Sequence, residues 1–126
     1  MTATGTAYSI SDLASATGLT PSTLRYYEQE GLMRDPIDRA PSSHRRYSPE
    51  DARWIEFVSR LRTTGMPIRE IQRYAALARE GEHTTPARLD LLRAHRERVL
   101  AELAALQDSL TAIEYKIASY ERFPTK

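Results

Sequence analysis

An unbroken helical segment near the C-terminus is the feature that most constrains the fold. Between Ala87 and Phe123 the chain has no glycine or proline, and apolar side chains recur at alternating spacings of three and four. A repeat of this kind held for more than four heptads is typical of a coiled coil. The seam consists of Leu89, Leu92, Arg96, Val99, Leu103, Leu106, Leu110, Ile113, Ile117 and Tyr120.

The length of this segment predicts a partner helix. At about 1.5 Å per residue the helix would run roughly 55 Å, too long to pack along one small globular head. An isolated amphipathic helix needs a partner. The alternative is a hairpin folded back on itself, but the segment contains no glycine or proline to break it. We expect a second copy to pair through Leu92, Val99, Leu103, Leu106, Leu110, Ile113 and Ile117. Arg96, the polar member of the seam, either sets the register or extends its charged end to solvent.

The composition excludes several classes of protein. The absence of cysteine rules out disulfides, thiolate metal sites and thiol redox switches. His44, His83 and His95 have no metal-ligand spacing, so neither a metal nor a cofactor is expected. No paired acids, nucleophile–base set or phosphate loop indicates an enzyme. No apolar run approaches the roughly 18 residues of a membrane span, and Met1 to Ala7 lacks the features of a secretory signal. We therefore expect a cytoplasmic protein.

The charge is informative in its kind and distribution. The net charge is only +1, but 16 of the 18 basic residues are arginine, all except Lys116 and Lys126. Arginine can fork onto a phosphate or stack on an aromatic ring. A GC-rich genome would enrich arginine as well, so the placement of the arginines matters more than their number.

Two short helices are predicted near the N-terminus. Ser11 is a candidate N-cap for a helix over Asp12–Ala16, and Thr17-Gly18-Leu19 is typical of a tight turn. Thr20-Pro21 supplies a cap and a first-turn proline for a second helix, which Gly31 ends. Two short helices joined by a glycine turn indicate a helix-turn-helix.

The rest of the head is predicted to be a loose hairpin, or wing, between residues 32 and 48, and two further helices. The third helix begins at Ser48-Pro49 and the fourth begins after Gly65-Met66-Pro67 and ends at Gly81. Residues 1–81 would form the head with its helical extension, and residues 82–126 the dimerisation helix. The core positions expected on the two helices are Trp54, Ile55, Val58, Leu61, Ile68, Ile71, Tyr74, Ala75 and Ala78.

The second helix has two chemically different sides. On a helical wheel Leu24 and Tyr27 fall on one side and anchor the core. Ser22, Arg25, Tyr26 and Gln29 fall on the other and offer groups suited to phosphates and base edges. A merely solvated polar face would look similar. The capped start, the preceding helix and the following wing together favour contact with DNA.

The predicted wing carries clustered positive charge. Arg39, His44, Arg45 and Arg46 lie within eight residues and precede Tyr47. Such a loop can reach the phosphate backbone beside a groove. The alternative is a basic loop that serves only solubility.

Three sequence motifs together resemble the MerR family of transcription regulators. They are Leu24-Arg25-Tyr26-Tyr27-Glu28 followed by Gly31-Leu32, then His44-Arg45-Arg46-Tyr47, then Thr64-Gly65-Met66-Pro67-Ile68-Arg69-Glu70-Ile71. With the C-terminal helix, the resemblance extends from about Tyr8 to Tyr120. It implies a mainly α protein with a winged helix-turn-helix head and a long antiparallel dimerisation helix.

The resemblance also implies a mechanism. Family dimers bind a pseudo-palindromic promoter, then bend and untwist its overlong spacer so that RNA polymerase can engage both of its elements. By motif position Arg25 and Tyr26 would be the chief contacts, with Ser22 and Thr23 near the helix start. Arg45 would hold a phosphate from the wing beside His44. Ser43 replaces a frequent glycine at the wing tip, and Tyr47 would pack the wing onto the head.

The sensing chemistry of known family members is missing from this sequence. There is no cysteine for metal, thiol or aldehyde sensing, and only Glu121 to Lys126 follow the seam, so the chain resembles a short form of the family. An unidentified small-molecule effector could bind near Tyr74, Leu77 and His83. The simpler interpretation is that these residues pack the junction. The alternative function is a protein-interaction module built on the same scaffold.

Overall fold

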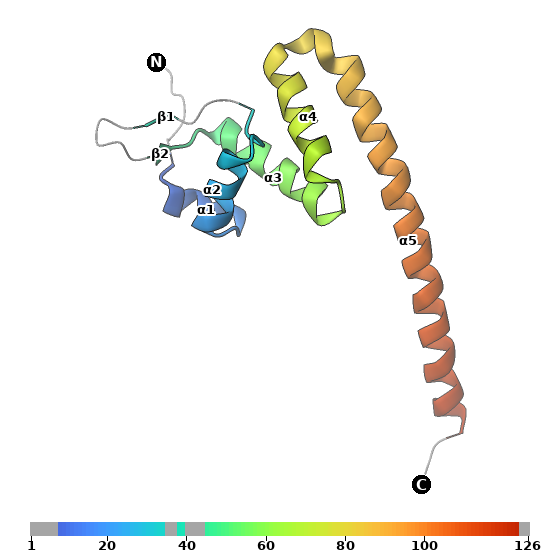
Figure 1. Ribbon diagram of the computed structural model, residues 1–126. Helices are drawn as coiled ribbons and strands as arrows, with labels where there is room; N and C mark the ends of the chain where they lie inside the picture. The colour runs from blue at the N-terminus through green and yellow to red at the C-terminus, as the bar shows by residue number, and fades with distance from the viewer. Residues whose placement is uncertain (1–7, 35–37, 40–44, 124–126) are drawn as a thin grey trace. The chain divides into compact units, whose positions relative to one another are not determined.

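The computed structural model describes residues 8–34, 38–39 and 45–123 (Figure 1). The elements are α1 (Ile10–Thr17), α2 (Pro21–Gln29), β1 (Asp38–Arg39), β2 (Arg45–Arg46), α3 (Pro49–Thr63), α4 (Ile68–Glu80), the 3-10 helix η1 (Glu82–Thr84) and α5 (Thr85–Arg122). The predicted fold class is confirmed: a mainly helical chain with a winged helix-turn-helix and a long C-terminal helix.

The chain divides into two compact units, residues 1–91, here called the head, and residues 92–126. The division falls inside α5, whereas the sequence analysis placed it at residues 81 and 82. The first turn of α5 is tied to the end of α4. Thr84 Oγ1 donates to the Leu77 carbonyl at 2.7 Å, and Arg88 Nε donates to Thr84 Oγ1 at 3.0 Å.

The starts of α2 and α3 follow from local sequence. Thr20 Oγ1 accepts the backbone N–H of Thr23 at 3.1 Å, ahead of a proline in the first turn. Ser48 Oγ accepts the N–H of Asp51 at 3.0 Å, and the Asp51 carboxylate accepts the N–H of Ser48 at 2.9 Å. Each cap satisfies backbone donors that the first turn leaves unpaired. Both predicted caps are confirmed.

The predicted start of α1 was wrong. The helix begins at Ile10 rather than Asp12, and its N-cap is Ser9 rather than Ser11. Ser9 Oγ accepts the N–H of Asp12 at 3.1 Å, and the Asp12 carboxylate accepts the N–H of Ser9 at 3.4 Å. This reciprocal box needs an acceptor side chain three residues after the cap. Ser9 has Asp12 there, whereas Ser11 would have Ala14.

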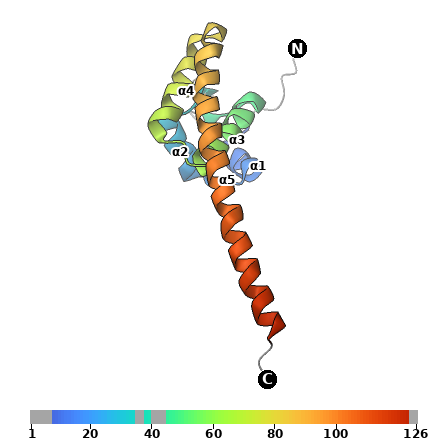
Figure 2. The ribbon, with the colours of Figure 1, turned by 90° about the vertical axis from the view of Figure 1, so that its right-hand side faces the viewer.

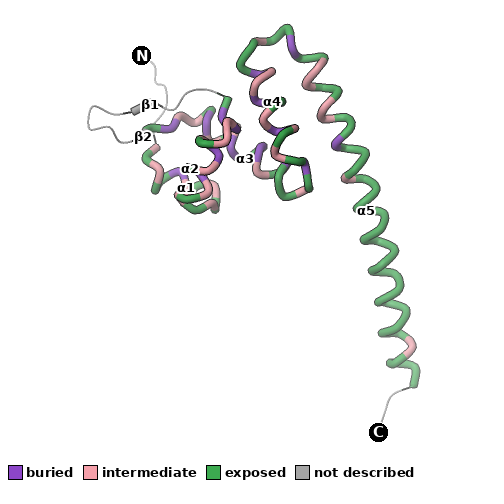
Figure 3. Tube along the Cα trace, viewed as in Figure 1, coloured by how far each residue is buried: buried purple, intermediate pink, exposed green. Residues whose placement is uncertain are grey.

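The core of the head is an apolar cluster contributed by all four helices (Figure 3). Its fully buried members include Leu13, Leu24, Tyr27, Leu32, Tyr47, Ile55, Val58 and Ile71. Most of the predicted core positions on α3 and α4 are confirmed. Trp54 and Ile68 are instead half-buried. The ring of Trp54 stacks on Tyr74 with the centroids 5.5 Å apart. Its indole N–H also donates a hydrogen bond to the Leu32 carbonyl.

Three side chains from α3 and α4 hold the backbone just after α2. Trp54 Nε1 donates to the Leu32 carbonyl at 2.7 Å, and Gln72 Nε2 donates to the Glu30 carbonyl at 2.8 Å. Arg79 donates to the carbonyl of Met33. We call the segment Glu30–Met33 the joint. Because its carbonyls are bound by side chains from two other helices, the end of α2 is fixed relative to the rest of the head.

The wing is an antiparallel hairpin, as predicted, in which Asp38 pairs with Arg46 and Arg39 with Arg45. An isolated bridge between Tyr8 and Tyr47 extends it, with reciprocal N–H to carbonyl hydrogen bonds of 2.7 and 2.8 Å. Tyr8, the first residue that the structure describes, is therefore hydrogen-bonded to the base of the wing. Residues 40–44, which include the predicted tip, lie outside the described residues.

Helix α5 is continuous from Thr85 to Arg122 (Figures 1 and 2). Large apolar side chains of its seam are exposed, among them Leu103 at 49%, Leu106 at 68% and Ile113 at 56%. Within residues 8–34, 38–39 and 45–123, no helix combines the length and the apolar character that crossing a membrane requires.

Replacing Ser48 by alanine is expected to lower the free energy of unfolding by about 1 kcal/mol, because the backbone N–H of Asp51 in the first turn of α3 loses its acceptor, Ser48 Oγ. Chemical denaturation measures the effect. Ser15→Ala, at an exposed position inside α1, is the control and should change stability by less than about 0.5 kcal/mol. An equal effect of the two substitutions would contradict a capping role for Ser48.

Candidate DNA interface

Helix α2 presents the predicted polar side chains away from the core. Ser22, Arg25 and Gln29 are exposed, and Tyr26 is half-buried. The opposite side is anchored by Leu24 and Tyr27, which are 1% and 2% exposed. The Tyr27 hydroxyl also lies 3.1 Å from Ser59 Oγ on α3. The anchored side fixes the rotation of the helix, so Arg25 must face outward.

Thr23 has a structural task at the start of α2. Its backbone N–H and its hydroxyl are both engaged with Thr20, the hydroxyl oxygens lying 3.0 Å apart. The residue is half-buried, whereas its neighbour Ser22 is exposed. The predicted pair near the helix start therefore differs in accessibility.

Arg62, on the last turn of α3, belongs to this surface and was missed by the sequence analysis. Its guanidinium carbon lies 5.1 Å from the ring centroid of Tyr26 and 5.8 Å from that of Tyr27. Contacts of this length are cation–π interactions. Arg62 is exposed, so it adds positive charge beside the predicted contact Tyr26. No local signal in the sequence joins residues so far apart in the chain.

The wing brings three of its four predicted residues into one hairpin. Arg39, Arg45 and Arg46 lie on its paired strands, and Arg46 is exposed. His44 lies outside the described residues, as do the side chains of Arg39 and Arg45.

Tyr47 packs the base of the wing onto the head, as predicted. It is 1% exposed, and its hydroxyl donates to Glu28 Oε2 of α2 at 3.5 Å. Helix α2 and the wing are thus joined directly at this residue.

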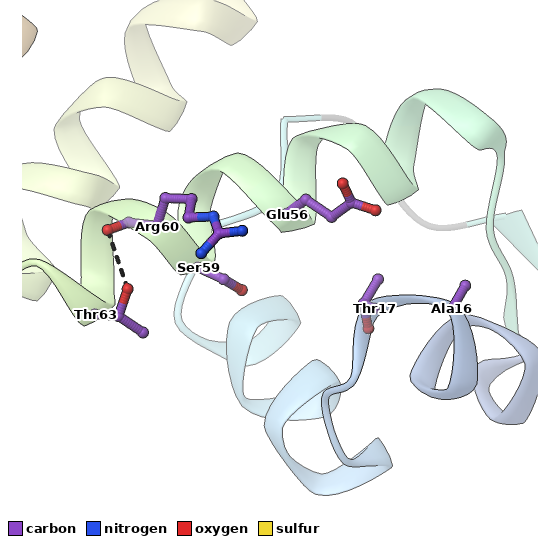
Figure 4. Close-up of a pocket in the computed structure, with 6 residues that line it drawn as sticks. All are labelled: Ala16, Thr17, Glu56, Ser59, Arg60 and Thr63. Carbon is purple, nitrogen blue, oxygen red and sulfur yellow. Dashed lines mark hydrogen bonds between the residues drawn. The ribbon is translucent and has the colours of Figure 1, made fainter.

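An open polar hollow lies between the end of α1 and the face of α3 (Figure 4). It has a volume of about 370 Å³ and is lined by Ala16, Thr17, Glu56, Ser59, Arg60 and Thr63. Small-molecule sites are usually enclosed and largely apolar. The hollow does not have that character, and we assign no ligand to it.

The three residues suggested for an effector site have separate surroundings. Tyr74 is 8% exposed and contacts the rings of Trp54 and Phe57. The Leu77 carbonyl accepts from Thr84, and the His83 side chain is exposed. These contacts favour the packing interpretation for Tyr74. In the part of the chain that the structure describes, no three His, Cys, Asp or Glu side chains are grouped so that they could hold a metal ion.

A helix-turn-helix with an outward arginine, followed by a basic hairpin, defines the winged helix-turn-helix class of DNA-binding proteins. Residues 8–77 match the MerR HTH family regulatory proteins, and residues 52–115 match the MerR DNA-binding family. The chain belongs to the MerR family of transcriptional regulators.

An uncharacterised HTH-type transcriptional regulator of Haemophilus influenzae is 31% identical to this chain, and the match covers 91% of this chain and 84% of the relative. The HTH-type transcriptional regulator AdhR of Bacillus subtilis is 41% identical over 72% of this chain and 64% of its own length.

Two solved structures share the fold over nearly the whole chain. HiNmlR, described as a MerR family regulator lacking the sensor domain and bound to promoter DNA, superposes with a TM-score of 0.84 at 31% identity. The match covers 93% of this chain and 92% of HiNmlR. A MerR family regulator of Bacillus thuringiensis gives a TM-score of 0.81 at 31% identity, with 91% and 100% coverage.

Proposed function

We propose that the protein is a homodimeric regulator that binds a pseudo-palindromic promoter and bends and untwists its spacer for RNA polymerase. The observation that carries the proposal is the exposed face of α2 around Arg25. This face is anchored from behind by Leu24 and Tyr27 and lies in a fold shared with a promoter-bound relative.

The proposed DNA contacts divide by their chemistry. Arg25 and Tyr26, with Ser22 and Thr23 at the helix start, enter the major groove, where a guanidinium reads guanine and hydroxyls accept several partners. The wing residues Arg39, His44, Arg45 and Arg46 hold phosphates outside the groove. Phosphate contacts set the position of the protein, and the base contacts set its specificity.

Dimerisation through α5 is supported by the apolar surface that this helix exposes. The proposed contacts are Leu92, Val99, Leu103, Leu106, Leu110, Ile113 and Ile117. Leu106, Leu110 and Ile117 are each at least half exposed in the single chain. Soluble proteins rarely leave a contiguous apolar stripe of this kind uncovered. A second copy covers it and at the same time supplies the second head that a two-fold promoter requires.

Two heads provide the free energy needed to deform the spacer. Bending a site of 20 to 30 base pairs costs on the order of 1–6 kcal/mol. A dimer that holds phosphates on both half-sites can offset that cost. Its contacts on the two half-sites would then bend the spacer between them, although no side chain contacts the spacer bases.

The test is binding of the purified protein to its own upstream DNA across a salt series, compared with unrelated DNA of the same length. We expect log K to fall linearly with log salt, with a slope of about −0.9 for each phosphate neutralised. We also expect the upstream DNA to bind about 10³-fold more tightly than the unrelated DNA. Equal affinity for the two DNAs would refute sequence-specific regulation and favour a protein-interaction module.

A further inference from the structure

The joint, Glu30–Met33, is bonded to α2 through its N–H groups and to other helices through its carbonyls. The N–H of Gly31 donates to the Glu28 carbonyl at 3.3 Å, and the N–H of Leu32 donates to the Tyr27 carbonyl at 2.9 Å. Gly31 has a φ of 72°. This combination is the Schellman ending that closes many helices. It joins the segment firmly to the end of α2, so whatever holds the carbonyls of the joint also holds α2.

Two donors on α4 bind the joint at both of its ends. Gln72 Nε2 lies 2.8 Å from the Glu30 carbonyl oxygen, and Arg79 donates to the Met33 carbonyl. The two side chains are seven residues apart, so they project from the same side of α4, about 10 Å apart along its axis. A segment attached at two separated points resists tilting as well as sliding, whereas a single attachment would leave a pivot.

The third attachment of the joint also depends on α4. Trp54 donates to the Leu32 carbonyl from α3, but its ring stacks on Tyr74 of α4 at an interplanar angle of 14°. Tyr74 is 8% exposed, and Leu32 is fully buried. Loss of a donor to a buried carbonyl is costly, because little water is available to replace it. The position of the joint therefore follows the position of α4.

The position of the joint in turn determines where Arg25 lies. Arg25 precedes Glu30 by five residues, about 7.5 Å along α2. A bidentate contact to a base requires two well-aligned hydrogen bonds at once, so a shift of about 0.5 Å at the guanidinium weakens it. Contacts to phosphate carry no sequence information, and long arginine side chains can follow a small shift of the backbone. A looser joint should therefore reduce specificity more than general affinity for DNA.

We infer that Gln72 and Arg79 are positioning residues for promoter recognition, which hold the joint so that Arg25 meets the base edges in one fixed geometry. The inference rests on the proposed binding of promoter DNA. It adds two residues that act through α2 rather than through a DNA contact of their own. Helix α4 thereby becomes a determinant of specificity, although the proposed base contacts belong to α2.

The test of Gln72 compares affinity for the upstream promoter with affinity for unrelated DNA of the same length. Gln72→Met keeps the length of the side chain but removes its donor. We expect the ratio of the two affinities to fall about tenfold, because a bidentate base contact discriminates by roughly 5- to 150-fold. Affinity for the unrelated DNA should change by less than about twofold. Gln72→Lys, which restores a donor, should keep the parental ratio.

Arg79→Met tests the second attachment and should lower the ratio by a similar factor. Because this change also removes a charge, Arg73→Met is the control. Arg73 is exposed on a different side of the same helix, and its loss should leave the ratio unchanged. Arg79→Lys keeps both the charge and a donor and should retain the parental ratio. An equal fall in Arg73→Met and Arg79→Met would contradict a positioning role for Arg79.

Two measurements separate positioning from a general loss of stability. Ser48→Ala destabilises the head without touching the joint, so its ratio should equal that of the parent. Gln72→Met should also lose its effect on the ratio when it is combined with Arg25→Ala, because the contact that it positions is then absent. Additive effects of Gln72→Met and Arg25→Ala, or a matching fall in Ser48→Ala, would show that Gln72 serves stability alone.

The inference and the proposed function fail in different ways. If the unsubstituted protein showed no preference for the upstream DNA, the proposed function would be wrong and the inference would fall with it. If the unsubstituted protein preferred the upstream DNA and Gln72→Met preferred it equally, the inference alone would be overturned.

Discussion

Replacing Arg25 by alanine is expected to lower affinity for the upstream promoter by about 100-fold. A bidentate contact between a guanidinium and a base is worth about 1–3 kcal/mol, and a dimer loses two of them. The exposed Arg25 side chain lies opposite the buried anchors Leu24 and Tyr27, so its loss should leave the head folded. Affinity is measured at one fixed salt concentration, and the thermal midpoint is followed by circular dichroism.

Two further variants make this result specific. Arg53→Ala removes an equal charge from an exposed side chain that pairs with Glu50 of its own helix at 3.5 Å. Nine residues before Arg62 it lies on the opposite side of α3, and it should leave affinity nearly unchanged. Arg25→Lys keeps the charge but cannot form the planar fork, so it should retain binding to unrelated DNA and lose preference for the promoter. If Arg25→Ala bound the upstream promoter as tightly as the unsubstituted protein, α2 would not be the helix that contacts the bases.

Replacing Leu106 by aspartate is expected to abolish the dimer at micromolar concentration and, with it, tight promoter binding. Leu106 is 68% exposed in the single chain and lies near the middle of the proposed dimerisation seam. An interfacial carboxylate without a partner costs several kcal/mol, and the symmetry of the dimer doubles the loss. Association should fall by more than about 10³-fold, which analytical ultracentrifugation measures directly.

The matched control lies on the same helix. Tyr115 is 76% exposed but stands at an outward heptad position, so Tyr115→Asp should sediment as the parent does. The head should remain folded in both variants, because its core residues all precede α5. A stable dimer of Leu106→Asp would show that another surface joins the two copies.

Local signals made much of the fold predictable. Thr20-Pro21 and Ser48-Pro49 each combine a cap with a first-turn proline, and both helices begin where these signals stand. The start of α1 was misplaced because two serines compete there. Only Ser9 has an aspartate at the distance that a reciprocal box needs. The cap could have been read from the sequence by testing that spacing at both serines.

The candidate site was less accessible to sequence reasoning, because its geometry is tertiary. The polar face of α2 follows from helical periodicity and could be predicted. The approach of Arg62 to Tyr26, and of Gln72 to the Glu30 carbonyl, joins residues from different helices. No periodicity encodes such contacts. They depend on how α2, α3 and α4 pack together, which the sequence pattern does not specify.

The joint after α2 also has an optical consequence. The chain contains one tryptophan, and that residue donates its indole N–H to the Leu32 carbonyl while stacking on Tyr74. The fluorescence of Trp54 therefore reports on the segment that follows α2, and no second indole contributes to the signal. A change in the backbone at this point alters the environment of the fluorophore. The protein thus carries an intrinsic spectroscopic reporter of whether its reading helix shifts when DNA is bound.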